Sequence, residues 1–257
     1  MNNILCEQKD HVFLITLNRV NKHNAFDDAI ISELQRALDT AIADANSRVI
    51  ILKANGRHFS AGADLAWMQR MAGYSEEENI ADAKHLAKLM HSFYSSPKPT
   101  IAMVQGAAMG GGAGLVAACD IAIASEKAQF CFSEVKLGLI PAVISPYVVN
   151  AIGARSAQEL FMSAQTFDAK RALDLHLIQH CVSEEMLLSF TLNYAQKIAS
   201  HPSGAVKAAK SLVQQVASKP INNELLDLTA RLIAKQRISP EGQHGMNAFL
   251  KKGHHVS

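Results

Sequence analysis

The feature that most constrains this chain is a run of glycines between residues 106 and 114. The segment reads GAAMGGGAG, and residues 110–114 contain four glycines. Each glycine inside a helix costs about 1 kcal/mol relative to alanine, so helix propensity does not explain the run. Either a ligand or another backbone approaches the chain closely there, or the backbone adopts dihedral angles that glycine tolerates best. Close packing of the following helix on a sheet is one explanation, and a binding site is the other.

The place of the run in the chain is typical of a binding site. An apolar strand is expected over residues 100–104, before the run, and an apolar helix over residues 111–119, within and after it. The glycines therefore fall at the C-terminal end of a strand and the N-terminal end of a helix. Free N–H groups and the positive end of the helix dipole face a ligand at such a place.

A second loop of small residues, SAGAD at 60–64, follows a predicted strand over 49–53. By itself the loop is explained by an ordinary turn in which Asp64 caps a helix beginning at Leu65. Together with the glycine run, however, it predicts two backbone N–H donors that converge on one oxygen. Such an oxyanion hole suits the enolate that forms from a thioester.

Glu134 is the candidate acid–base residue. It lies in the segment QFCFSEVKLGLIP, directly after an apolar strand expected over residues 129–132. Among Phe130, Phe132, Val135 and Leu137 this carboxyl group is expected to be partly desolvated, which raises its pKa and suits proton transfer. A solvated acid at the start of a helix is the alternative.

The order of the strand and helix patterns predicts an α/β fold. Predicted strands alternate with helices in the first part of the chain: the strands are 11–17, 49–53, 100–104, 121–124 and 129–132, and the helices are 27–44, 76–95 and 111–119. This alternation implies right-handed crossovers and a largely parallel sheet. From residue 145 onward most windows are helical, apart from a short strand near residues 180–182. We expect a mixed core over residues 1–195 and a helical region over residues 196–257.

Composition argues against several classes of protein. The chain is 49% hydrophobic and 19% charged, which excludes a disordered chain. Its net charge of +2 argues against a dedicated nucleic-acid binder. The uncharged stretch 100–119 contains five glycines and fits a buried strand, turn and helix better than a membrane span. The four cysteines form no CxxC pair, so we expect no metal site, no disulfide framework and a reducing, cytoplasmic location.

Five segments carry a family pattern in order along the chain: LNRVNKHNAF (17–26), HFSAGADL (58–65), PTIAMVQGAAMGGGAGLVAACDIAIASEKAQF (99–130), SEVKLGLIP (133–141) and GMNAFLKK (245–252). With them the sequence resembles the enoyl-CoA hydratase/isomerase (crotonase) family. The resemblance implies a crotonase-like ββα spiral core and a C-terminal helical region that forms a homotrimer or a dimer of trimers. It also implies an acyl-CoA thioester as substrate, with no cofactor beyond the CoA of that substrate, and a place in fatty-acid or branched-chain amino-acid degradation.

The resemblance also assigns roles to residues. The backbone N–H groups of Ala61 and Gly111 are expected to hold the thioester oxygen, with Glu134 as the catalytic carboxylate. Trp67 and Met68 suit either an acyl pocket or a core stripe, and Phe249 and Lys252 are expected to reach CoA from a neighbouring subunit. The residues expected to bind substrate or CoA are Lys22, Asn24, Ala25, Ala63, Asp64, Trp67, Met68, Gly110, Gly114, Pro141, Phe249 and Lys252.

The sequence departs from the family pattern at Gly114, where typical hydratases of the family carry a second glutamate. A segment that is usually rich in glycine also reads AVISPYV here, over residues 142–148. Either Glu134 performs the acid–base steps of hydration alone, or it moves a proton between Cα and Cγ as a Δ3–Δ2-enoyl-CoA isomerase. The strings FSAGADLAWMQRM and LGLIPAVISPYVV resemble bacterial methylglutaconyl-CoA hydratase-like members, which favours hydration. A non-catalytic CoA- or RNA-binding module is the alternative from another class.

Overall fold

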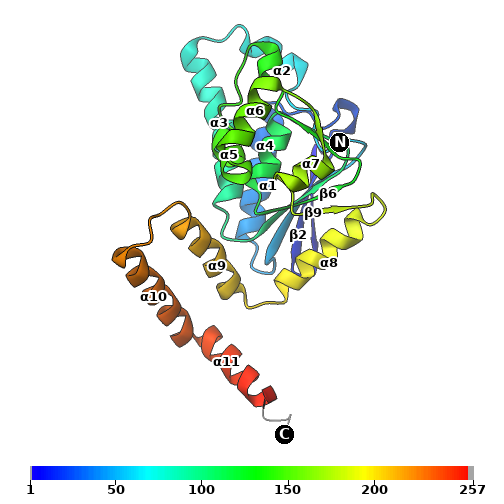
Figure 1. The fold of residues 1–257 in the computed structure, drawn as a ribbon. Coiled ribbons are helices and arrows are strands. Elements are labelled where there is room, and N and C mark those ends of the chain that lie inside the picture. The colour runs from blue at the N-terminus through cyan, green and yellow to red at the C-terminus, as the bar shows by residue number, and fades with distance from the viewer. Residues whose placement is uncertain (1, 254–257) are drawn as a thin grey trace. The chain divides into compact units, whose positions relative to one another are not determined.

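A computed structural model describes residues 2–253 of the chain, with side chains up to residue 251. The chain divides into two compact units, residues 1–197 and 198–257, and the boundary falls within one helix. The first unit is a mixed α/β body, and the second consists of helices (Figure 1). The mixed α/β core with a C-terminal helical region, as expected from the sequence, is confirmed.

The first unit is built on a six-stranded sheet in the order β1-β2-β3-β4-β6-β9. All neighbouring strands are parallel except β1 and β2, which form an antiparallel pair at one edge. The strands are β1 (Ile4–Lys9), β2 (Val12–Leu17), β3 (Val49–Ala54), β4 (Thr100–Val104), β6 (Ile121–Ser125) and β9 (His180–Val182). The central strands β2 and β4 are buried along their whole length, as expected for parallel strands covered on both faces.

A small second sheet has the order β5-β7-β8. Its strands are β5 (Ala107–Met109), β7 (Gln129–Cys131) and β8 (Phe167–Asp168). Because β5 and β7 are parallel and aligned, with Met109 opposite Cys131, the segments that follow them emerge at the same edge. Gly110 and Gly111 follow β5, and Glu134 follows β7, so this sheet brings the two segments together.

The helices of the first unit pack in succession, α1 on α3, α3 on α4, α4 on α5 and α5 on α6 (Figure 1). Their bounds are α1 (Asp28–Ala43), α2 (Leu65–Met71), α3 (Glu76–Tyr94), α4 (Gly111–Ala118), α5 (Ser145–Ile152), α6 (Ala154–Ser163), α7 (Ala169–Asp174) and α8 (Leu187–Ala199). Two short 3-10 helices lie between a strand and a helix: η1 (Val20–Lys22) between β2 and α1, and η2 (Glu134–Leu137) between β7 and α5. Helix α4 is buried over nearly its whole surface.

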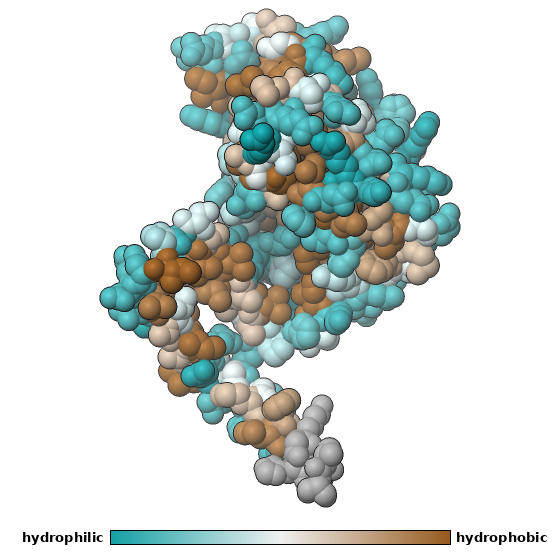
Figure 2. Space-filling view, in the orientation of Figure 1, coloured by the Kyte–Doolittle hydropathy of each residue, from teal (hydrophilic) through white to brown (hydrophobic). Residues whose placement is uncertain are grey.

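The second unit contains α9 (Ser203–Val216), α10 (Asn223–Ile238) and α11 (Pro240–Gly253). No residue of α9 or α10 is buried, although both helices carry rows of apolar side chains. A groove of about 780 Å³ lies between them, lined by residues that include Leu212, Leu226 and Ile233. Figure 2 shows apolar side chains across this region.

The uncharged stretch 100–119 divides between β4, β5 and α4 instead of forming one long helix. Across the described part of the chain, every helix is too short or too polar to cross a membrane.

Candidate active site

Gly110 and Gly111 form the turn between β5 and α4, which is called the glycine turn below. Gly110 has φ +50° and ψ −119°, a conformation that a residue with a side chain rarely adopts. Gly111 is the first helical residue, so its N–H has no intrahelical acceptor. The first turn closes when the Gly114 N–H donates to the Gly110 carbonyl oxygen, at 3.0 Å. The turn therefore presents free amide groups at the N-terminus of a buried helix.

The SAGAD loop lies directly against this turn. The Ser60 N–H donates to the Ala107 oxygen, and the Met109 N–H donates to the Ser60 oxygen, both at 3.0 Å. A Cβ atom added at Gly112 would lie 2.8 Å from the Ser60 Cβ, so a side chain at position 112 would clash with the loop. The predicted meeting of the two small-residue loops is confirmed by these contacts.

The prediction that Ala61 supplies an oxyanion donor is wrong. Its N–H donates to the His23 carbonyl oxygen at 3.0 Å, and that bond holds the loop to the end of η1. The sequence pattern showed which loop supplies an amide but not which amide of the loop points outward. The direction of each amide in the loop is set by the pairing of Ala63 with Phe26.

The Ala63 N–H takes the place of Ala61 as the second free amide. Ala63 pairs with Phe26 as a parallel bridge, in which Phe26 donates to the Gly62 oxygen at 2.7 Å and Asp64 donates to the Phe26 oxygen at 2.8 Å. Successive N–H groups of an extended segment point to opposite sides, so the Ala63 N–H points away from Phe26. A Cβ atom at Gly111 would lie 3.6 Å from the Phe26 ring, which places Phe26 beside both amides.

The carboxyl group of Glu134 lies over the glycine turn. Its Oε1 is 3.2 Å from the position that a Cβ on Gly110 would take, and its Oε2 is buried with no hydrogen-bond partner among the described residues. Burial raises the pKa of Glu134, and a hydrogen bond from its own backbone N–H opposes the rise only in part. The expected partial desolvation is borne out, because Glu134 is part-buried and its pKa shifts in the expected direction. Leu137, expected among its apolar neighbours, is 58% exposed instead. This carboxyl group can gain and lose a proton beside two free amides.

Position 114 lies one turn further along α4, and its space is occupied. A Cβ atom at Gly114 would lie 2.7 Å from the Ile144 Cβ and 3.3 Å from the Met90 Cε. Ile144 is buried, and its methyl groups cover the Gly114 backbone. The sequence showed that Gly114 lacks a carboxylate, but it did not show that Ile144 fills the volume.

A cluster of charges surrounds Asp64, the last residue of the SAGAD loop. Its carboxylate lies 3.2 Å from Arg19 Nη1 and 3.7 Å from Lys22 Nζ, and it caps α2 by accepting the Ala66 N–H at 2.9 Å. Burial acts to raise the pKa of Asp64, but the Ala66 bond and the two cations outweigh it and lower the pKa. Lys22 is half exposed, so its ammonium group remains accessible to an anionic ligand.

The side chain of Asn24 holds the surrounding backbone together. Its Oδ1 accepts the Arg19 N–H at 2.9 Å, and its Nδ2 donates to the carbonyl oxygens of Asn55 and His58 at 2.9 and 2.8 Å. Asn24 is buried, and its backbone has a positive φ of +55°. Contact between this segment, including the buried Ala25, and CoA stays a prediction.

Trp67 belongs to the core and not to an exposed pocket wall. Its side chain is 5% exposed and donates from Nε1 to Asp82 Oδ1 at 3.2 Å, which pins α2 to α3. Met68 beside it is partly exposed, and Pro141 is buried. In the second unit Phe249 is 78% exposed on α11, and the side chain of Lys252 lies outside the described residues.

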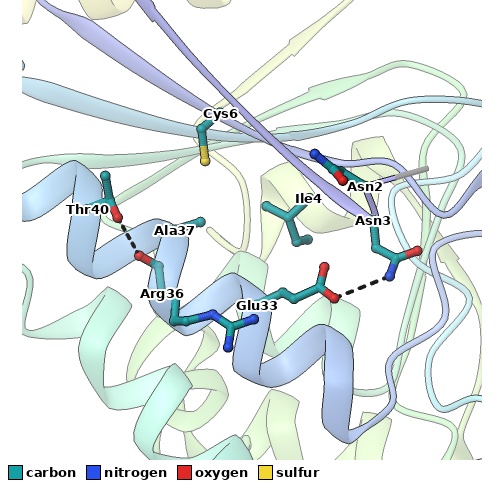
Figure 3. A pocket seen from close by; sticks show the side chains of 8 residues that line it. All are labelled: Asn2, Asn3, Ile4, Cys6, Glu33, Arg36, Ala37 and Thr40. Carbon is teal, nitrogen blue, oxygen red and sulfur yellow. Dashed lines mark hydrogen bonds between the residues drawn. The ribbon is translucent and has the colours of Figure 1, made fainter.

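A separate hollow of about 410 Å³ lies between β1 and α1 (Figure 3). Its lining residues are Asn2, Asn3, Ile4, Cys6, Glu33, Arg36, Ala37 and Thr40. None of them belongs to the SAGAD loop, the glycine turn or η2. Within the described residues, no group of three His, Cys, Asp or Glu side chains is placed to hold a metal ion.

Comparisons with known proteins show which family the chain is similar to. Residues 7–256 match the family model described as enoyl-CoA hydratase/isomerase. A crystal structure described as an enoyl-CoA hydratase/isomerase (crotonase) from Legionella pneumophila is 62% identical, covers 97% of this chain and 96% of its own, and has a TM-score of 0.94. An enoyl-CoA hydratase structure from Shewanella pealeana is 43% identical over 98% of this chain and 94% of its own, also with a TM-score of 0.94. The 2,3-dehydroadipyl-CoA hydratase of Escherichia coli is 28% identical over 98% of this chain and 97% of its own.

Proposed function

Because the chain belongs to the enoyl-CoA hydratase/isomerase family, we propose that it adds water across the α,β double bond of an acyl-CoA. The observation that carries the proposal is the Glu134 carboxyl group, buried beside the turn that presents the Gly111 amide. The neighbouring Ala63 amide supplies a second donor. Each such donor typically contributes about 3 to 4 kcal/mol to stabilisation of a developing oxyanion.

In the proposed reaction the thioester oxygen lies between the Ala63 and Gly111 amides. The oxygen of a water molecule bonds to Cβ as Glu134 accepts a proton from that water, and the π electrons of the double bond move onto the thioester as an enolate. Glu134 then gives this proton to Cα of the enolate and returns to its starting carboxylate form. One water is added, and one side chain carries the proton throughout.

The direct test is a panel of 2-enoyl-CoA thioesters incubated with the protein and followed by mass spectrometry. Hydration adds the mass of one water to the substrate. The Glu134→Gln protein, which keeps the shape of the side chain but cannot accept the proton, is expected to lose about 100-fold to 10,000-fold in turnover. Turnover by the Gln variant equal to that of the original protein would contradict the proposal.

Isomerisation of a 3-enoyl-CoA is the second candidate, and the Gly114–Ile144 contact favours it. A Δ3–Δ2 isomerase needs one carboxylate to remove a proton from Cα and return it to Cγ, and no second acid–base group. Incubation with 3-enoyl-CoA distinguishes the two reactions, because isomerisation moves the double bond without adding mass. CoA binding or a salt-sensitive RNA complex, with no turnover of either substrate, would instead favour a non-catalytic module.

We also propose that the second unit assembles the protein as a homotrimer or a dimer of trimers. The support is the row of apolar side chains that α9, α10 and α11 leave exposed, which includes Leu226, Ile233 and Phe249. Exposed apolar surface of this extent is typical of an interface.

The four cysteines are free thiols, which supports a reducing location such as the cytoplasm.

A further inference from the structure

Ile144 and Glu134 cover neighbouring turns of one helix. Glu134 Oε1 lies over Gly110, at 3.2 Å from the position of an added Cβ, and Ile144 lies over Gly114, with its Cβ 2.7 Å from the position of an added Cβ. Gly110 and Gly114 are joined by the hydrogen bond that closes the first turn of α4. The two side chains therefore cover glycines that follow one another around the start of the same helix.

The segment that carries both side chains is held by its own hydrogen bonds. The Leu139 N–H donates to the Glu134 oxygen at 3.1 Å, and the Ala142 N–H donates to the Ile140 oxygen at 2.8 Å. The Ser145 hydroxyl donates to the Ala142 oxygen at 2.8 Å, directly after Ile144. Because these turns connect η2 to α5, the position of Ile144 relative to Glu134 is set by the fold.

The elements packed around Glu134 provide apolar side chains and a few titratable groups, which include Tyr147 on α5. Helix α4 has no titratable residue, and α3 contributes Met90 to this wall. On η2 and β7, Lys136 Nζ lies 4.0 Å from Cys131 Sγ. Helix α6, which packs against η2, carries Arg155 and Glu159, and Glu159 pairs with Arg171 at 2.7 Å.

We propose that Ile144 is a positioning residue that makes Glu134 the single proton carrier of this site. By filling the volume over Gly114, it keeps water and any second polar side chain from reaching the carboxyl group from that side. Its catalytic consequence rests on the proposed function: the proton that Glu134 accepts returns to the same bound substrate, because Gly114 has no side chain that could take it. The effect of Ile144 on the environment of Glu134 does not depend on which reaction the enzyme performs.

The test compares Ile144→Ala with Val148→Ala, a matched loss of buried side chain from α5, and with the conservative Ile144→Val. The titration of Glu134 is followed in the free protein by ¹³C NMR of labelled glutamate carboxyl groups, with Glu134→Gln identifying its signal. Ile144→Ala lets water approach the carboxyl group, so the midpoint is expected to fall by about one pH unit. Val148→Ala is expected to leave the Glu134 midpoint unchanged. Ile144→Val is expected to lower that midpoint by less than Ile144→Ala does, and it replaces Ile144→Ala in the test if the latter does not fold.

The pH dependence of kcat/KM on the best acyl-CoA substrate supplies a second measurement. Its acid limb is expected to move to lower pH by the same amount in Ile144→Ala and to stay unchanged in Val148→Ala. An unchanged Glu134 midpoint in Ile144→Ala, or an equal shift in both Ala variants, overturns the role of Ile144 even if hydration is established. A lowered midpoint in a protein that turns over no acyl-CoA supports that role and rejects the proposed function instead.

Discussion

Arg19 and Asp64 form a largely buried ion pair, with 3.2 Å between Arg19 Nη1 and Asp64 Oδ2. The same nitrogen lies 2.9 Å from Asp27 Oδ2. Asp27 caps α1 by accepting the Ile30 N–H, and Asp64 caps α2 by accepting the Ala66 N–H. One guanidinium group therefore joins the starts of two helices, beside the Ala63 amide that is proposed to bind the thioester oxygen.

Replacement of Arg19 by Met is expected to destabilise the fold by about 2 kcal/mol, because it leaves Asp64 buried with only the more distant Lys22 as a cation. Chemical denaturation measures the loss. Arg70→Met is the control, since Arg70 and Asp28 form an exposed pair that contributes less than about 1 kcal/mol. Equal losses in the two variants would show that the Arg19 cluster does not stabilise the loop.

Gly111 offers a clean removal of one amide. Proline is well tolerated at the first position of a helix, so Gly111→Pro is expected to delete the N–H donor while α4 still forms. Turnover is expected to fall by about 100-fold to 1,000-fold. Gly111→Ala keeps the N–H, and its Cβ would make ordinary contact with Phe26, so this control is expected to stay within a few-fold of the original kcat. A similar kcat in both variants would exclude the Gly111 amide from the oxyanion site.

Glu134 makes stability depend on pH in a defined direction. Its pKa is higher in the folded protein than in the unfolded chain because burial disfavours the charged form. Between the two pKa values the folded state binds more protons, so this group stabilises the fold at low pH and loses that contribution as pH rises through the folded pKa. Glu134→Gln lacks this dependence. The melting temperature of Glu134→Gln minus that of the original protein is therefore expected to increase as the pH rises from about 4 to about 8. A constant difference would contradict the buried environment.

Gly114 and Ile144 are expected to be energetically coupled. Gly114→Ala forces a methyl group against Ile144 and is expected to cost about 3 kcal/mol. In an Ile144→Gly background, which removes the contacting atoms, the same substitution is expected to cost less than about 1 kcal/mol. Urea denaturation of the four proteins measures the coupling. Additive losses would mean that the two positions do not share one volume.

The apolar face of the second unit predicts that assembly depends on Ile233. Ile233→Asp places a charge in the groove between α9 and α10 and is expected to convert the assembly to smaller species, as measured by light scattering after size exclusion. Ile80→Asp is the matched control, because Ile80 has nearly the same exposure, 47% against 49%, but lies on α3 of the first unit. Assembly that survives Ile233→Asp would place the interface elsewhere.

Sequence periodicity predicts most of this fold because β2, β3, β4 and β6 are short apolar strands separated by amphipathic helices. It misses β1, since Ile4–Lys9 carries charged residues and is largely exposed at the edge of the sheet. It also misses β5 and β8, which are too short to establish a period. Such elements form because a neighbouring strand provides their hydrogen bonds, and that information is not local.

The candidate site shows the same division. The glycine run and the acid at 134 are singled out by residue type and position, and the family resemblance assigns the amide role to Gly111. The choice between Ala61 and Ala63 depends on which side of the loop pairs with Phe26, and the role of Ile144 depends on a contact between segments 30 residues apart in the chain. Residue type predicts which chemistry is present, whereas the direction of an amide or a methyl group follows from tertiary packing.

Helix α4 is enclosed by the rest of the first unit, and its eight residues contain no polar side chain. Its amide dipoles are therefore oriented once, when the protein folds, and do not reorganise as substrate charge develops. A substitution at the buried positions of α4, which begin at Gly112, disturbs the interior as well as the site. Divergence toward new acyl groups is consequently expected in the segments that surround α4, where side chains can change while the dipoles remain in place.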